Sequence, residues 1–131
     1  MTTAPDLTGF ADDVDTAPLT YDRIFELLAN EHRRRLLYAL RAETRLPLAD
    51  AALILASWET GRPIDTVPAA TLDAVELSLE HAHVPKLGRH DVIDFDETDR
   101  VITRGPQASL LLSVMEASGV LAAIEDDISR D

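Results

Sequence analysis

The chain of 131 residues contains no cysteine, and only one of its 12 basic residues, Lys86, is a lysine. The absence of cysteine excludes disulfides, thiolate metal sites and cysteine nucleophiles. Its five glycines are scattered, so that no glycine-rich phosphate loop precedes a helix. Because the sequence also lacks a recognisable set of nucleophile, base and orienting group, we expect no catalytic residue, no metal and no cofactor.

Long hydrophobic runs are lacking as well. The longest apolar stretch, residues 110–124, is interrupted by serine, glutamate and glycine, and it is shorter than the roughly 18 apolar residues that span a bilayer. Residues 1–18 have neither the basic region nor the apolar core of a secretory signal. We therefore expect a cytoplasmic protein with one hydrophobic core.

Acidic residues outnumber basic ones by 24 to 12, which gives a formal net charge of −12. A surface rich in aspartate and almost free of lysine resembles that of proteins from extreme halophiles, where salt screens the repulsion between carboxylates. The alternative is an acidic surface that mimics or avoids nucleic acid. The distinction matters because this charge argues strongly against DNA binding in ordinary salt but only weakly in concentrated salt.

The apolar spacing predicts a helical domain over residues 19–104, preceded by a flexible acidic tail over residues 1–18. Thr20 is expected to cap the first helix, and Asn30 to cap a second helix over residues 31–42. Pro47 is typical of the first turn of a third helix, whose apolar stripe ends at Trp58. We expect Trp58 to belong to the core rather than to a ligand pocket.

A fourth helix is predicted to open at Pro68 and to end or kink at Pro85, because proline cannot donate to the helical ladder. Three- and four-residue steps predict its buried face, which comprises Leu72, Val75, Leu79 and Ala82. The period then changes from helical to extended. Two β-prone runs, residues 92–95 and 100–103, flank a predicted hairpin turn over residues 96–99.

A final helix is expected within residues 105–131. Its apolar residues follow alternating steps of four and three, a heptad pattern formed by Leu110, Val114, Ala117, Leu121, Ile124 and Ile128. We expect this seam to pair with its twofold mate in a homodimer, because a second apolar side is left to face the domain. The alternative is that the helix folds back over the first helix of its own chain.

Four segments carry a resemblance to known regulators. Residues 27–37, LLANEHRRRLL, resemble the opening helices of arsenical-resistance-repressor-like winged-helix regulators. Residues 78–87, SLEHAHVPKL, are similar to the His-x-His-x-Pro-Lys-Leu signature of an uncharacterised winged-helix domain common in haloarchaea, and residues 56–59 and 92–96 fit the same family. The resemblance covers residues 19–103. It implies a mainly α (α+β) fold, a winged helix-turn-helix with a C-terminal dimerisation helix, and a role in transcription.

In such a fold the fourth helix enters the major groove of DNA, usually with basic or amide side chains toward the bases. Helical geometry gives the predicted outer face no arginine or lysine; it comprises Ala70, Asp73, Ala74, Leu77, Glu80, His81 and Val84. The hairpin is acidic too, because its carboxylates outnumber Arg100 and Arg104. Carboxylates that face phosphates oppose DNA binding, so this helix departs from the usual pattern.

Arginines instead cluster in and after the second helix. They are interpreted either as contacts to a DNA backbone or as a solvated face paired with Glu31 and Glu43. Two hypotheses follow. The first is a homodimeric DNA-binding regulator, whose expected contacts are Arg33, Arg34, Arg35, Ala70, Leu77, His81, Lys86, Arg89 and Arg100. The second is a winged-helix module for protein–protein interaction without base-specific contacts, through Asp73, Leu77, Glu80 and Val84.

The two histidines His81 and His83 are two positions apart, which on an α-helix separates them by about 160°. They are therefore poorly placed to bind one metal ion together; the alternative to structural roles is a zinc-sensing site with Glu80 or Asp91. We expect His83 near the core and His81 outside, both in structural roles.

Overall fold

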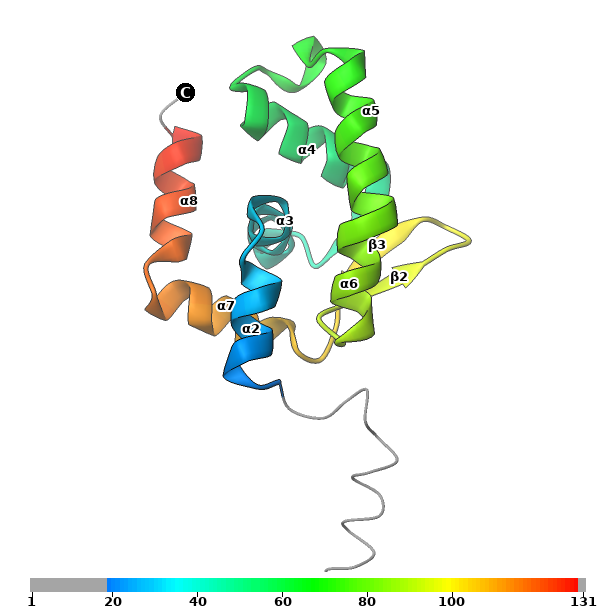
Figure 1. Ribbon diagram of the computed structural model, residues 1–131. Coiled ribbons are helices and arrows are strands. Elements are labelled where there is room, and N and C mark those ends of the chain that lie inside the picture. Colours follow the sequence, from blue (N-terminus) through cyan, green and yellow to red (C-terminus); the bar gives the residue numbers. More distant parts are fainter. Residues whose placement is uncertain (1–18, 130–131) are drawn as a thin grey trace, which may run out of the picture.

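The computed structural model describes residues 19–129, and the expected acidic tail over residues 1–18 lies outside them. This part of the chain is mainly helical with one small antiparallel sheet (Figure 1), which confirms the expected fold class at that level. The elements in chain order are α2 (Tyr21–Leu28), α3 (Glu31–Ala42), β1 (Arg45–Pro47), α4 (Leu48–Thr60), η2 (Ile64–Thr66), α5 (Ala69–Ser78), η3 (Leu79–His83), α6 (Val84–Arg89), β2 (Ile93–Asp96), β3 (Val101–Arg104), α7 (Ala108–Ala117) and α8 (Val120–Ser129).

Both predicted N-caps are confirmed. The Thr20 hydroxyl accepts a hydrogen bond from the backbone N–H of Arg23, and the Asn30 side chain accepts from those of His32 and Arg33. Each cap satisfies amides that the first turn of a helix leaves without a partner. The second cap turns the chain into α3, which lies at the centre of the molecule between α8 and α5 (Figure 1) and buries Leu36 and Leu40 completely.

The sheet has the strand order β1-β3-β2, and both pairings are antiparallel. The predicted hairpin is confirmed, with β2 and β3 each beginning one residue later than expected. Strand β1 was not predicted, because three residues ending in a proline show no alternation of apolar and polar side chains. It pairs Leu46 with Ile102, and both side chains are buried in the core.

The expectation that the fourth helix ends at Pro85 is wrong. The chain stays helical from Ala69 to Arg89, because the π-helical segment η3 precedes the proline. The backbone N–H of Val84 donates to the carbonyl of Leu79, five residues earlier. This wider turn falls where an α-helix would press the proline ring against the carbonyl four residues before it.

The π-turn also changes which side chains are buried after Leu79. Val75 and Leu79 are buried and Leu72 is half-buried, as predicted, but Ala82 is exposed. Val84, expected on the outer face, is only 3% exposed. The cause is the extra residue in the turn, which rotates everything after it by about 100° relative to an α-helix.

The predicted continuous final helix is also wrong, because α7 and α8 are separate helices bent by 81°. The break falls at Gly119, whose φ of +83° lies in the left-handed region that glycine adopts without steric cost. The heptad residues therefore do not form one stripe: Leu121 and Ile124 are buried in the core of the same chain, whereas Leu110 and Ala117 are exposed. Between residues 19 and 129 no single helix has the length and apolarity to cross a membrane, and α7 and α8 meet that criterion only as a bent pair.

Candidate functional site

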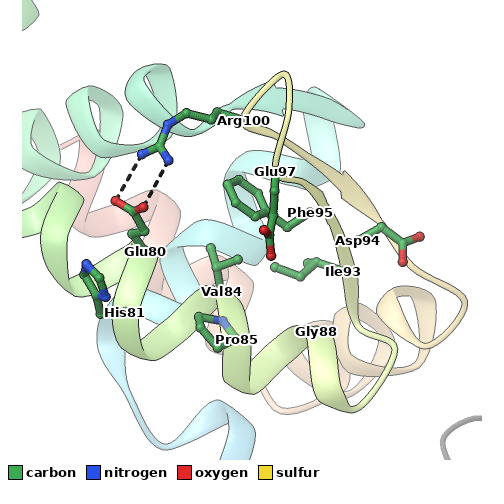
Figure 2. Close-up of a pocket in the computed structure, with 10 residues that line it drawn as sticks. All are labelled: Glu80, His81, Val84, Pro85, Gly88, Ile93, Asp94, Phe95, Glu97 and Arg100. Atoms are coloured by element: carbon green, nitrogen blue, oxygen red, sulfur yellow. Dashed lines mark hydrogen bonds and ion pairs between the residues drawn. The ribbon is translucent and has the colours of Figure 1, made fainter.

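A groove of about 480 Å³ lies between the helical run η3–α6 and the β2–β3 hairpin (Figure 2). Its floor is apolar, and its lining includes Val84, Pro85, Ile93 and Phe95. Charged side chains stand around this floor, from Glu80 on η3 to Glu97 and Arg100 on the hairpin. The groove thus combines an apolar base with a rim that carries both signs of charge.

Two local rules place these groups. Side chains alternate along a strand, so Ile93 and Phe95 face the helix while Asp94 points away from it (Figure 2). The π-turn brings Val84 to the floor of the groove, which an unbroken α-helix would not do. The hairpin turn is held by Asp96, whose carboxylate accepts hydrogen bonds from the backbone N–H groups of Thr98 and Asp99.

A bidentate ion pair joins η3 to the hairpin across the groove. The two terminal nitrogens of Arg100 donate to the two carboxylate oxygens of Glu80, each at 3.0 Å (Figure 2). The hydrogen bond from Arg100 lowers the pKa of Glu80, and the same bond raises the pKa of Arg100. Both side chains remain partly open to solvent, with exposed fractions of 46% for Arg100 and 32% for Glu80.

The backbone of Arg100 is fixed separately from its side chain. Its φ of +56° lies in the left-handed region, and its carbonyl accepts a hydrogen bond of 2.9 Å from the backbone N–H of Leu48, at the start of α4. The position of the Arg100 main chain therefore does not depend on the contact between its guanidinium and Glu80.

The opposite side of η3 is buried in a polar network. Arg33 donates to the carbonyls of Leu27 at 2.7 Å and Glu26 at 2.9 Å, and its third contact is Nδ1 of His83 at 3.3 Å. His83 is 7% exposed, as predicted for the core side, and burial, reinforced by the charges of Arg33 and His32, lowers its pKa to about 4. His83 is therefore neutral at pH 7 and accepts the hydrogen bond at Nδ1.

The arginines of the predicted patch have partners within the protein. Arg34 donates to the carbonyl of Leu28 at 2.7 Å, and Arg35 is buried and paired with Glu31 at 2.8 Å. Arg33 and Arg34 satisfy carbonyls at the end of α2 and so tie α2 to α3, whereas the partners of Arg35 are carboxylates. The guanidinium groups of Arg33 and Arg34 thus have acceptors within the fold, although both residues stay partly exposed.

Of the remaining predicted contacts, His81 and Arg100 line the groove. Lys86 is paired with Glu26 at 2.8 Å, while Arg89 is exposed. On the outer face of α5 and η3 the predicted exposure is confirmed for Ala70, Leu77 and His81, and Leu77 is 60% exposed. Asp73 is exposed as well. The structure therefore brings Leu77, His81, Glu80 and Arg100 to one side of the molecule and excludes Arg33 from it.

A second hollow of about 430 Å³ lies among α2, α3, α7 and α8, and its lining includes Phe25, Val114, Val120 and Ile124. Beside it, Tyr21 and Phe25 are stacked with ring centroids 6.5 Å apart and are 79% and 61% exposed. The sequence analysis missed this aromatic pair. The available signal was two aromatic residues four positions apart on α2 that lie off its buried stripe of Ile24, Leu27 and Leu28.

Within the described range, no group of three or more His, Asp or Glu side chains is arranged to hold a metal ion. His81 and His83 lie on different sides of η3, one exposed and one buried. Trp58 is half-buried and packs edge to face on Tyr38, with centroids 5.8 Å apart, at the margin of the core. This agrees with a core role for Trp58.

A family model described as a domain of unknown function, DUF7344, matches residues 25–103, which run from within α2 to within β3 and include both sides of the groove. No curated protein and no solved structure matches the chain.

Proposed function

This chain belongs to the DUF7344 family, and from that premise we propose that it is a winged-helix DNA-binding protein that acts in transcription. One observation carries the proposal: the exposed face of α5 and η3 lies beside a two-stranded hairpin, and α5 packs on α4. In a winged helix-turn-helix the recognition helix and the wing have this relation, and together they follow the surface of DNA. The support is architectural.

The proposed interface differs from the arginine patch. Ala70, Leu77 and His81 on the outer face of the helix approach the base edges, and Leu77 offers an apolar contact of the kind that recognises a thymine methyl group. Arg89 and Arg100 approach the phosphates. Arg33, Arg34 and Arg35 take no part, because the carbonyls of α2 and nearby carboxylates hold them.

The acidic surface repels DNA less in concentrated salt than in dilute salt, and we propose that the protein is salt-adapted. At 1 M salt the Debye length is about 3 Å, so exposed carboxylates no longer repel phosphates over the width of the interface. Apolar contacts and short hydrogen bonds persist under those conditions, whereas counterion release contributes little. The affinity for DNA is therefore expected to fall much less with salt than that of a basic DNA-binding protein.

A titration of the full chain against fragmented genomic DNA, at low and at multimolar salt, tests the proposal. Leu77→Ser and Arg100→Gln are expected to weaken binding, and Arg45→Gln, an exposed arginine on β1, serves as the control. Absence of DNA retention at every salt concentration would overturn the proposal, as would equal losses in the control.

We further propose that the protein is a homodimer, joined by the face that carries Tyr21, Phe25 and the second hollow. Val114 and Ile124 of the heptad pattern line this hollow, but the six heptad residues do not form one continuous stripe. Tyr21 and Phe25 are exposed beside the hollow whose lining includes Val114, Val120 and Ile124. With a twofold axis on this face, the aromatic side chains of each copy would pack into the hollow of the other.

Measurement of the molecular mass of the wild type and of Tyr21→Ser/Phe25→Ser in solution tests this, with the exposed Ile64→Ser as control. A monomeric wild type contradicts it. Removing α7 and α8 by truncation after Thr103 would not test the dimer, because α7 contributes the fully buried residues Leu111 and Met115 to the core.

A second candidate function, a module that binds a basic protein segment, is favoured by the acidic rim of the groove. Glu97 stands over the apolar floor, Asp73 lies on the same helical face as Glu80, and the one hairpin arginine on the rim is already neutralised by Glu80. Val84 belongs to the groove floor in this version and not to an outer strip. An arginine-rich peptide that binds wild type tightly, while DNA does not bind, would establish this candidate and remove the first.

A further inference from the structure

We infer that Glu80 controls access to Arg100: Glu80 holds the guanidinium in the free protein, and a phosphate oxygen of nucleic acid competes for it on binding. The inference rests on the proposed DNA-binding function and adds a device to it. Glu80 then acts as a positioning residue, which lowers the affinity for any phosphate backbone that cannot displace it.

The geometry places the pair where such a competition can occur. Glu80 comes from η3 and Arg100 from the end of the hairpin turn, and both hydrogen bonds cross the mouth of the groove (Figure 2). The pair is half-exposed, so a phosphate can reach the guanidinium without opening the core. Because the carbonyl of Arg100 is held by the backbone of Leu48, only the side chain has to move.

The chemistry of the two partners makes the exchange feasible. A carboxylate and a phosphate both present two oxygens to the planar fork of an arginine, so the same donors serve either acceptor. An ion pair open to water contributes little net stability, so breaking it costs little free energy. The contrast is Arg33, whose donors are directed at backbone carbonyls that no ligand can replace.

The charges around the pair determine what the exchange costs. With the pair intact, the guanidinium is neutralised by Glu80, while Glu76 on α5 and His81 on η3 also act on the two partners, and Glu97 stands on the same rim. When a phosphate takes Arg100, Glu80 loses its counter-charge and lies close to a polyanion. This repulsion is strongest at low salt, so the effect of Glu80 is expected to shrink as salt is added.

The first experiment examines the pair without DNA, by NMR titration of the Glu80 carboxylate in wild type and Arg100→Gln. The wild-type pKa is expected below that of an ordinary glutamate, and to return toward the ordinary value in Arg100→Gln. The guanidinium N–H groups of Arg100, which donate to Glu80, are expected to exchange faster with solvent in Glu80→Gln. If the titration and the exchange are both unchanged, the pair does not form in solution and the inference fails, whatever the protein binds.

The second experiment is a double-mutant cycle on DNA affinity with wild type, Glu80→Gln, Arg100→Gln and the double variant. Glu80→Gln is expected to tighten binding of random DNA about three- to tenfold at low salt, and less at multimolar salt. The gain is expected to vanish when Arg100 is already glutamine. Asp73→Asn, which removes one exposed charge from the same helical face, is the matched control and should give a smaller gain that Arg100→Gln does not abolish.

Each outcome decides the matter. An equal gain in both Arg100 backgrounds assigns the effect to net charge and overturns the inference, as does weaker binding by Glu80→Gln. If wild type and Glu80→Gln both fail to bind DNA while the NMR titration shows the pair, the proposed function fails and the competition for phosphate fails with it. Tightening in the wild-type background alone supports both.

Discussion

The two sides of η3 hold their charged groups in opposite ways. On one side the buried His83 accepts a hydrogen bond from Arg33, which also donates to two carbonyls at the end of α2. On the other side Arg100 donates two hydrogen bonds of 3.0 Å to Glu80, and both side chains are partly exposed to solvent. One five-residue segment thus carries a structural polar network and an open ion pair.

The difference teaches where an arginine is available for function. Partly buried donors that lose their acceptors are only partly compensated by water, so the network around Arg33 contributes to the packing of α2, α3 and η3. An exposed pair can exchange either partner for water or a ligand at little cost. Sequence position alone does not separate these cases, because a run of three adjacent arginines is occupied by the fold and a single hairpin arginine is not.

The largest expected loss of stability comes from disrupting the base of the hairpin, which positions Arg100 and the groove. A Cβ on Gly105 would lie 2.5 Å from the backbone oxygen of Asp91, where Gly105 donates to Val92 and Gln107 donates to Asp91. Gly105→Ala is therefore expected to destabilise the protein by at least about 3 kcal/mol, measured by urea unfolding. Gly88→Ala is the control, since its nearest neighbour would be 3.9 Å away; equal losses in both would contradict the argument.

Replacing Arg33, the donor to the α2 carbonyls, is expected to reduce stability by less than Gly105→Ala. Arg33→Met keeps an unbranched apolar stem but leaves the carbonyls of Leu27 and Glu26 without these donors. We expect a loss of about 2–3 kcal/mol in the free energy of unfolding. Arg41→Met, whose side chain is 46% exposed, is the matched control and should lose much less. If the two variants were equally stable, the network would not be structural.

Much of this comparison could be predicted from sequence, and the rest depended on contacts between distant residues. The caps at Thr20 and Asn30 and the hairpin follow from local rules, so they were predicted to within a residue. The π-turn was not, because a proline in a helical pattern is locally compatible with an end, a kink or a wider turn. That single choice moved Val84 from the predicted outer face to the floor of the groove.

The candidate site divides in the same way. Leu77 and His81 lie before or within the π-turn and were placed correctly on the outer face. The pair of Glu80 with Arg100 joins residues 20 positions apart in sequence, and the acceptors of Arg34 and Arg33 lie six and seven residues upstream of them, on another helix. Neither set of partners leaves a periodic signal. The bend at Gly119 was likewise hidden by a heptad pattern that continues across it.

A pH titration gives an effect of intermediate size that is confined to the buried side. The folded-state pKa of His83 is about 4, below the value of about 6.5 in an unfolded chain, so only the unfolded state takes up the proton between these values. Stability should therefore fall as pH drops from about 6.5 to about 4, by about 2–3 kcal/mol, and change little further through this group below that.

The control variants for this titration separate His83 from the other histidines. His83→Gln, which can still accept from Arg33, should flatten most of the slope, whereas His81→Gln on the exposed side should leave it unchanged. His90, whose pKa is also lowered mainly by burial, contributes in the same direction and accounts for a residual slope. Urea unfolding at a series of pH values measures this. A slope that survives His83→Gln undiminished would assign the pH dependence elsewhere.

The smallest expected effect on stability is that of Glu80→Gln, because the fold does not depend on the pair of Glu80 and Arg100. Both partners of the pair stay partly exposed, and water can replace each hydrogen bond when the charge is removed. The free energy of unfolding of Glu80→Gln, measured at the same salt as Arg33→Met, should not differ detectably from that of wild type. If Glu80→Gln were instead as destabilising as Arg33→Met, the hairpin would depend on the pair for its position. Arg100 would then be as fully committed to the fold as Arg33, and no phosphate could take it without disordering the groove.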